Sequence, residues 1–205
     1  HGRGDTDEII DDNANPSNNY FVWTVPMLTI PVILIKWNDY NFQNQQLIFD
    51  SVPRTGTLND VDDLLNKKNY NYPKNNPEVV PTGSVADYFK AISHGRMMIN
   101  YEIINASSDN NNISTLDDYA YNIDDSYINY GETNDSNGSN LKPKLLAAYN
   151  SAVNNYGIEN FDKLYGKNKV CFMHCGYGAE THVENRLDYI WSHKWSFSNN
   201  GSTIN

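Results

Sequence analysis

The sequence predicts an α/β fold of the α+β kind, in which helices flank a twisted mixed sheet. The run "IPVILIKW" (30–37) is short, continuous and rich in β-branched residues, which is typical of a strand buried on both faces. Segments with helical periodicity separate it from later strand-like segments, and this order favours a layered domain over a helix bundle or a sandwich. A chain of 205 residues with 39% hydrophobic and 13% aromatic content can bury a sizeable core.

Residues 1–25 are acidic, rich in asparagine and without periodicity, so we expect a flexible arm before a domain over 26–205. The tripeptide Arg3-Gly4-Asp5 in this arm is of the integrin-binding type, but chance produces such triplets more often than function does. A net charge of -10 and a pI near 4.8 oppose binding to nucleic acid. No apolar run approaches the roughly 20 residues that span a bilayer, so no membrane span is expected.

Two helices are predicted after the first strand, over 41–52 and 58–68. A third is predicted after Gly83, with Ser84 as its cap, Asp87 as the partner in a capping box and Gly95 at C′. A strand follows directly, and its core face is predicted to consist of alternate residues, Met97, Ile99, Tyr101 and Ile103.

Residues 105–140 are polar with scattered tyrosines, which predicts a long loop that could serve a function. The aspartate pairs at 117–118 and 124–125 are interpreted as solvated. Asn140 as a cap and Gly157 as a stop predict a helix between them. The segment 169–176 then predicts a strand.

No nucleophile or metal motif assembles from these residues, because H-E-x-x-H, G-x-S-x-G and a P-loop are all absent from the sequence. Cys171 and Cys175 are predicted to be two buried thiols. A zinc site made of both with His174 lacks the usual C-x2-C spacing and a fourth ligand. Chemistry alone favours a structural, hydrogen-bonded His174 over a functional one. The glycines at 176 and 178 nevertheless allow the close backbone approach that turns a strand end into the wall of a cleft.

Three motifs in order resemble the front half of the immune inhibitor A family of secreted zinc metallopeptidases. They are "GSVADYFKAISHG" from Gly83, "FMHCGYGAE" from Phe172 and "IWSHKWSF" from Ile190. The family pattern is G-S-x-x-(D/E)-Y-(Y/F), then H-A-G-x-G-x-E, then I-W-S-H-(K/R)-W. Cys175 stands where the family usually has alanine. The resemblance covers about residues 30–197.

The resemblance implies a zincin-like N-terminal subdomain. In the family an H-E-x-x-H segment beyond the third motif holds the zinc and supplies the general base. We therefore expect zinc in the complete family domain but no metal ligand or catalytic residue in this chain. The family's Asp- and Gly-rich stretch, a candidate calcium site, is reduced here to "NFDKLYGKNKV" (160–170).

The resemblance assigns substrate binding to the second and third motifs. A peptide substrate is expected to lie along a cleft wall formed by His174, Gly176, Tyr177, Gly178 and Glu180. His193 is expected to pack with Trp191 and Trp195, and lining the same cleft is its other role.

The expected function is that of the N-terminal part of a zinc metallopeptidase domain, inactive by itself, whose partners are the remaining half of the domain and a peptide or protein substrate. The alternative is a non-catalytic structural or binding module on the same scaffold, such as a surface or particle component that docks through its tyrosine-rich loop. The resemblance implies an extracellular location, with association with a particle as the alternative.

Overall fold

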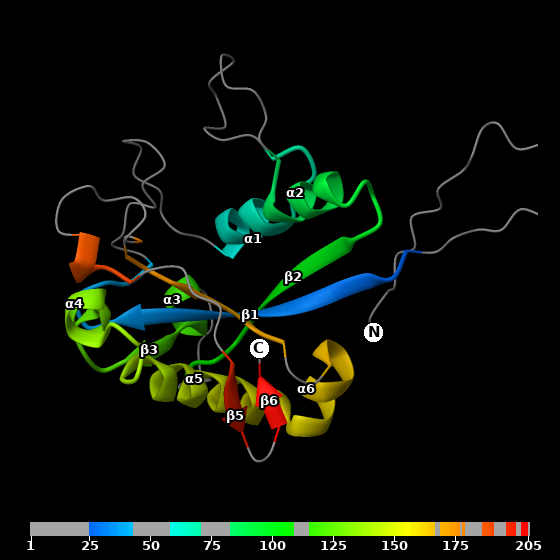
Figure 1. Ribbon diagram of the computed structural model, residues 1–205. Coiled ribbons are helices and arrows are strands. Elements are labelled where there is room, and N and C mark those ends of the chain that lie inside the picture. Colours follow the sequence, from blue (N-terminus) through cyan, green and yellow to red (C-terminus); the bar gives the residue numbers. More distant parts are fainter. Residues whose placement is uncertain are drawn as a thin grey trace, which may run out of the picture. The chain divides into compact units, whose positions relative to one another are not determined.

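The computed structural model confirms the predicted α/β fold (Figure 1). It describes residues 25–42, 58–70, 83–108, 115–166, 169–176, 178, 186–190, 196–199 and 202–204. Most of the predicted arm (1–25) and of the predicted helix over 41–52 lies outside the described residues. The chain divides into two compact units, residues 1–29 with 63–101 and residues 30–62 with 102–205.

Strand β1 (Met27–Trp37) is the hub of a four-stranded sheet. The strand order is β2-β1-β3, where β2 is Met98–Ile104 and β3 is Tyr121–Ile123, and β4 (Cys171–His174) also pairs with β1. The four residues 32–35 of β1 are fully buried, which confirms the prediction of a strand covered on both faces. The strand begins three residues earlier than predicted.

Both β3 and β4 run parallel to β1. Ile35–Trp37 pairs with β3 in the register Trp37 to Ile123, and Val32–Ile35 pairs with β4 in the register Ile35 to His174. The N–H of Cys175 continues the β4 pairing by donating to the carbonyl oxygen of Ile35 at 3.0 Å. Parallel pairing brings the carboxyl ends of these strands to one edge of the sheet, where ligands bind in open α/β sheets.

The first unit contains helix α2 (Val85–Ile92), which begins as predicted. The Ser84 side chain accepts from the N–H of Asp87, and the Asp87 carboxylate accepts in return from the N–H of Ser84 at 3.2 Å. The same carboxylate also accepts from the N–H of Asn69 at 2.7 Å, after α1 (Leu58–Asn66). The serine and aspartate of the first motif therefore begin a helix and tie it to the preceding turn.

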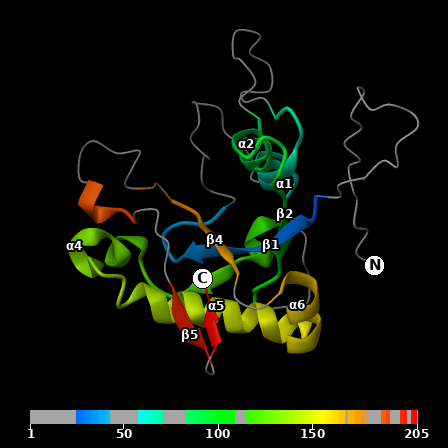
Figure 2. The ribbon, with the colours of Figure 1, turned by 45° about the vertical axis from the view of Figure 1, so that its right-hand side comes forward.

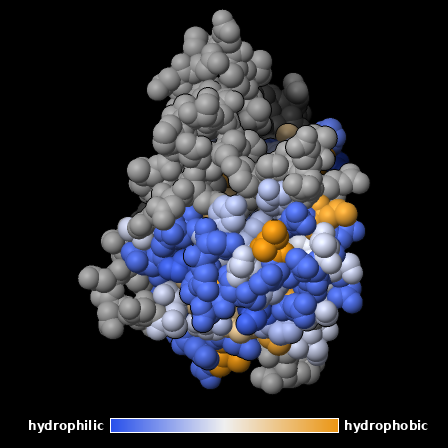
Figure 3. Space-filling view, turned by 90° about the vertical axis from the view of Figure 1, so that its left-hand side faces the viewer, coloured by the Kyte–Doolittle hydropathy of each residue, from blue (hydrophilic) through white to orange (hydrophobic). Residues whose placement is uncertain are grey.

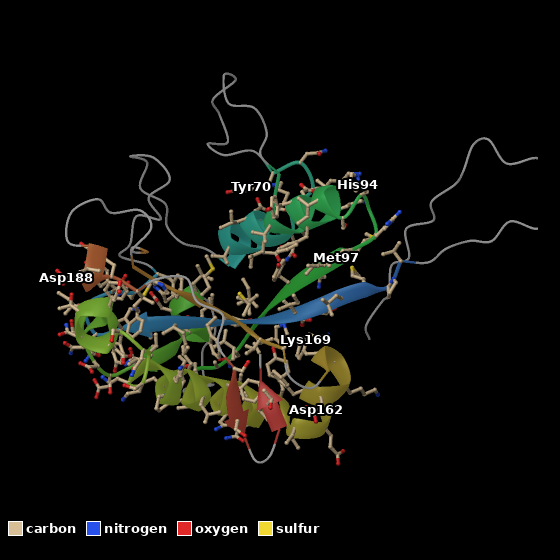
Figure 4. The ribbon with its side chains drawn as sticks, in the orientation of Figure 1. Tyr70, His94, Met97, Asp162, Lys169 and Asp188 are labelled. Carbon is tan, nitrogen blue, oxygen red and sulfur yellow. The ribbon has the colours of Figure 1, made fainter. Side chains whose placement is uncertain are left out.

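The end of α2 differs by one residue from the prediction. His94 follows the cap residue with φ 53°, and Gly95 comes next with φ 76°. The N–H of His94 donates to the Ala91 carbonyl and the N–H of Gly95 to that of Lys90, which is the hydrogen-bond pattern of a Schellman motif. Histidine therefore occupies C′ and Gly95 the position after it. Figure 4 shows His94 at the end of the helix and Met97 before β2.

The core face predicted for β2 is only partly correct. Ile99 and Tyr101 are buried, but Met97 lies before the strand and is 43% exposed. The Asn66 side chain pairs with the backbone of Tyr101, donating to its carbonyl at 2.7 Å and accepting from its N–H at 2.8 Å. An amide side chain thus makes the two hydrogen bonds that a neighbouring strand would otherwise supply.

The region 105–140 is more regular than the predicted loop. Its described part contains β3, two short α-helices and one 3₁₀ helix, which are α3 (Leu116–Tyr119), α4 (Glu132–Asp135) and η1 (Tyr127–Tyr130). A second capping box, between Thr115 and Asp118, starts α3. Asp117 is buried rather than solvated, because its Oδ1 accepts from the N–H of Phe42 at 2.7 Å.

Helix α5 (Leu141–Tyr156) lies along one face of the sheet in the second unit, as Figures 1 and 2 show. Its buried residues recur at helical spacing, and they are Leu141, Leu145, Ala148, Tyr149 and Ala152. Gly157, with φ 76°, ends the helix. Helix α6 (Ile158–Tyr165) was not predicted, and its Phe161 packs on Tyr149 at 5.5 Å between ring centroids. The hairpin of β5 (Phe197–Asn199) and β6 (Ser202–Ile204) lies against α5.

The start of α5 differs from the prediction. Asn140 precedes the helix, but its side chain makes no capping hydrogen bond. The buried carboxylate of Asp135 takes that role, since its Oδ2 accepts from the N–H of Leu141 at 2.9 Å and its Oδ1 from the N–H of Asn140 at 3.0 Å. A negative charge is also favourable at this end of a helix dipole.

Replacing Asp135 by alanine is expected to lower the free energy of unfolding by about 1–2 kcal/mol, because the buried N–H of Leu141 loses its acceptor. Urea unfolding followed by circular dichroism measures the change. Asn140→Ala is the matched control and should cost well under half as much, since its side chain caps nothing. Equal losses in the two variants would contradict the assignment of the cap.

Candidate functional site

The candidate site lies in the second unit, where β1, β3 and β4 end side by side. Trp37 ends β1, Ile123 ends β3 and His174 ends β4. The loop after β1 is tied to the loop after β3, because the N–H of Asn38 donates to the Asp125 carbonyl at 3.1 Å and its side chain donates to Asp124 Oδ1 at 2.9 Å. The three strand ends therefore lie at one edge of the sheet, and hydrogen bonds between the loops after β1 and β3 hold that edge together.

His174 is half-buried at this edge. Its Nδ1 lies 3.0 Å from the carbonyl oxygen of Cys175, and its ring lies 6.3 Å from that of Trp37 and 5.7 Å from that of Tyr127. Trp37 is buried and donates its Nε1–H to the Cys175 carbonyl at 3.0 Å. His174 is thus held within an aromatic cluster, which is consistent with the prediction of a structural, hydrogen-bonded histidine. Its side chain is still partly accessible.

Gly176 has a backbone φ of 107°, which residues other than glycine rarely adopt. A Cβ at this position would lie 3.1 Å from Cε2 of Tyr127, so the absence of a side chain lets the backbone pass close to the ring. Gly178 forms a parallel β-bridge with Ile190. The second and third motifs of the sequence, 12 positions apart at these two residues, are therefore joined by backbone pairing.

Three of the six predicted site residues lie outside the described part of the chain. They are Tyr177, Glu180 and His193, and the question of whether His193 packs with Trp191 and Trp195 lies outside it as well. The structure brings together the other three predicted residues along one segment, namely His174, Gly176 and Gly178.

The residues that sequence reasoning missed are aromatic. Tyr127 is buried at the centre of the cluster, with its ring 5.6 Å from that of Trp37 and 5.4 Å from that of Tyr40. Tyr130 lies 5.2 Å from Trp37 on a second side. The only signal in the sequence was the presence of tyrosines in a polar stretch, and that signal was interpreted as a docking loop.

Asp125 and Tyr130 form a hydrogen-bonded pair beside the cluster. The Asp125 carboxylate accepts from the Asn129 side chain at 2.7 Å, from the Ser126 N–H at 2.7 Å and from the Tyr130 hydroxyl at 3.0 Å. The Asn129 hydrogen bond, followed by the other two, lowers the pKa of Asp125 below its usual value. Burial, together with the neighbouring Asp125, raises the pKa of Tyr130. The phenol therefore stays protonated and acts as a fixed donor rather than as a base.

The two cysteines are free thiols, as predicted, but of the two only Cys175 is buried. Cys175 is buried and donates its S–H to the Tyr40 carbonyl at 3.0 Å, and burial raises its pKa to about 12. Cys171 is half-buried, and burial raises its pKa as well. Since a thiolate is the form that attacks substrates or binds metals, neither thiol is suited to nucleophilic catalysis at neutral pH.

Cys175 is expected to remain unlabelled by iodoacetamide in the folded protein at pH 8 and to react fully once urea unfolds the chain. A raised pKa keeps the thiol protonated at all lower pH values, so labelling should accelerate only as the pH approaches 12. Mass spectrometry of the digested protein gives the labelled fraction at each cysteine. Half-buried Cys171 is the internal comparison and should react first. Labelling of Cys175 at the rate of a free peptide thiol would contradict its buried placement.

The described residues do not fit a zinc ion. Among them no group of three or more His, Cys, Asp or Glu side chains is arranged to hold a metal. In addition, the S–H of Cys175 donates to a backbone carbonyl.

Within the described segments there is no helix of the length and hydrophobicity required to cross a bilayer.

The η3 helix (Arg186–Asp188), just before the third motif, is anchored to α4. The Thr133 hydroxyl donates to Asp188 Oδ1 at 3.3 Å, and Figure 4 shows Asp188 beside that helix. Gly131 precedes α4, and a Cβ there would overlap the backbone carbonyl of Asp188. The described surface on this side is mostly hydrophilic (Figure 3). Its exposed polar residues in and after α4 include Glu132, Thr133, Asn134, Ser136 and Asn137.

The sequence matches no protein-family model and no curated protein.

Proposed function

We propose that this chain is the N-terminal part of a secreted, immune inhibitor A-like zinc metallopeptidase domain, in which it forms one wall of the substrate cleft. The complete domain would hydrolyse peptide bonds with water activated by a zinc ion that other residues hold. The role of the present chain is to bind and orient the peptide. The scaffold carries no step of the chemistry itself.

The observation that carries this proposal is the parallel bridge between Gly178 and Ile190. The proposal needs the H-C-G-Y-G and I-W-S-H-K-W motifs to act at one place, although eleven residues (179–189) separate the end of the first from the start of the second. The bridge brings these motifs into contact at the carboxyl end of a parallel strand. Such strand ends are where α/β sheets bind their ligands.

The geometry around His174 supports a binding role. A half-buried imidazole flanked by Trp37 and Tyr127 is fixed in orientation, and Gly176, which has no Cβ, lets the segment after β4 pack closely on the Tyr127 ring. An extended peptide is held mainly by main-chain hydrogen bonds, and these require close backbone approach. The entropic cost of binding is lower because these groups are already ordered before a peptide binds.

The test uses the natural gene product that contains these residues. Its reading frame is expected to encode H-E-x-x-H after residue 205, and the purified protein is expected to carry one zinc per chain and to cleave an unfolded protein such as casein. Chelation should abolish the cleavage, and added zinc should restore it. A gene product with neither the motif nor stoichiometric zinc would overturn the proposal in favour of a non-catalytic binding or structural module.

A further inference from the structure

Tyr127 links the strand ends of the candidate site to the start of the I-W-S-H-K-W motif. Its backbone is fixed first, because its N–H donates to Asp39 Oδ1 at 3.0 Å, directly after β1. The Ser126 hydroxyl donates to the other oxygen of the same carboxylate at 2.6 Å. Asp39 therefore clamps the start of η1 against the end of the central strand.

The ring of Tyr127 is fixed next. It is 2% exposed and lies edge-on to Trp37 and Tyr40, with centroid distances of 5.6 and 5.4 Å. Its other neighbours are His174, at 5.7 Å, and the backbone of Gly176, which passes close because that residue has no Cβ. The ring therefore has a single position relative to the segment that follows β4.

The hydroxyl makes the third contact. It accepts from the N–H of Ile190 at 3.2 Å, and Ile190 is buried. Ile190 also forms the bridge to Gly178, and the neighbouring Tyr189 ring lies 6.0 Å from that of Tyr127. A buried N–H without an acceptor is costly, so the hydroxyl determines where this residue settles.

We infer that Tyr127 is a positioning residue for peptide binding, which sets where Ile190, the first residue of the third motif, lies relative to His174 and Gly176. This inference rests on the proposed function, because it concerns the same cleft wall. Removing the hydroxyl keeps the ring and its packing but releases Ile190. The distance between Ile190 and Gly178 should then become variable, which weakens the binding of peptide more than any later step.

The experiment compares Tyr127→Phe with Tyr149→Phe in the natural gene product. Tyr149 is a buried tyrosine on α5 that packs on Phe161 and takes no part in the cluster. Hydrogen exchange is the first readout. The peptide containing Ile190 is expected to exchange about tenfold faster in Tyr127→Phe, while peptides from α5 keep their protection and Tyr149→Phe leaves the Ile190 peptide unchanged. Unchanged protection at Ile190 in Tyr127→Phe would overturn the inference whether or not the protein is a peptidase.

Kinetics on a peptide substrate is the second readout. Tyr127→Phe is expected to raise KM about tenfold and to change kcat by less than about threefold, while Tyr149→Phe changes neither. A fall in kcat at constant KM, or kinetics identical to those of the wild type, would overturn the positioning role. Absence of any peptidase activity in the wild-type gene product would instead count against the proposed function, and the exchange result would still decide the role of Tyr127.

Discussion

Replacing Trp37 by alanine is expected to lower the free energy of unfolding by about 3–5 kcal/mol, which is the usual cost of truncating a buried tryptophan. Trp37 is 3% exposed and contacts the rings of Tyr127, Tyr130 and His174. Alanine would leave a cavity where three strand ends meet. It would also remove the Nε1–H donor of Trp37 and leave the carbonyl oxygen of Cys175 with only His174 Nδ1, also at 3.0 Å, beside it among the described side chains. Urea unfolding followed by near-ultraviolet circular dichroism measures the loss.

Trp37→Phe separates the two parts of this effect. Phenylalanine keeps most of the ring packing but has no N–H for the Cys175 carbonyl, so we expect a loss of about 1–3 kcal/mol. A loss below about 1 kcal/mol in the alanine variant would mean that Trp37 does not hold the strand ends together. Equal losses in the two variants would assign nearly all of the effect to the hydrogen bond.

Gly176→Ala is expected to have the second largest effect, with a loss of about 2–4 kcal/mol in the free energy of unfolding. Two causes add. A φ of 107° is strained for alanine, at a cost of about 1–3 kcal/mol, and the new Cβ would lie 3.1 Å from the Tyr127 ring. Because Tyr127 is packed on other sides by Trp37 and Tyr40, it has little room to move. Thermal and urea unfolding together give the loss.

Gly166→Ala is the matched control for this prediction. Gly166 has φ 71° at the end of α6, and a Cβ there would meet nothing within 4 Å. The control has the backbone strain without the contact. Its φ 71° and ψ 165° lie in a region that essentially only glycine adopts, so it is expected to cost about 1–3 kcal/mol. If Gly176→Ala were no more destabilising than Gly166→Ala, the close approach to Tyr127 would not constrain the site.

The parts of the fold that were predictable are those in which local chemistry and burial agree. The run Val32–Ile35 is apolar at every position, so it required a strand with both faces covered. Ser84 and Asp87 specify a helix start within four residues, because their side chains bond the backbone next to them. Gly157 likewise ends α5 with a backbone conformation that favours glycine.

The parts that were not predictable depend on partners far away in the chain. The cap of α5 is Asp135 rather than Asn140, because the turn between them folds the carboxylate back onto the helix. Tyr127 and Tyr130 lie in a stretch without periodicity, and their burial depends on contacts with Trp37 at the end of β1 and with Asp39 in the loop after it.

The candidate site shows the same division. His174, Gly176 and Gly178 could be named from a motif, since each belongs to one short segment. Their environment could not be derived, because the residues around them come from the ends of β1 and β3 and from η1. Sequence spacing says nothing about which loops the parallel strands bring to one edge.

Parallel pairing between β1 and β4 has a consequence for synthesis of the protein. The hydrogen bond from the Trp37 side chain to the carbonyl oxygen of Cys175 joins residues 138 positions apart in the sequence. A ribosome that adds about 5–20 residues per second needs roughly 7–28 s to synthesise the residues between them. Throughout this delay the nascent chain presents an apolar, β-branched segment with no partner on that side. Such segments self-associate, so we expect expression yield to depend on chaperone supply and to improve at low temperature.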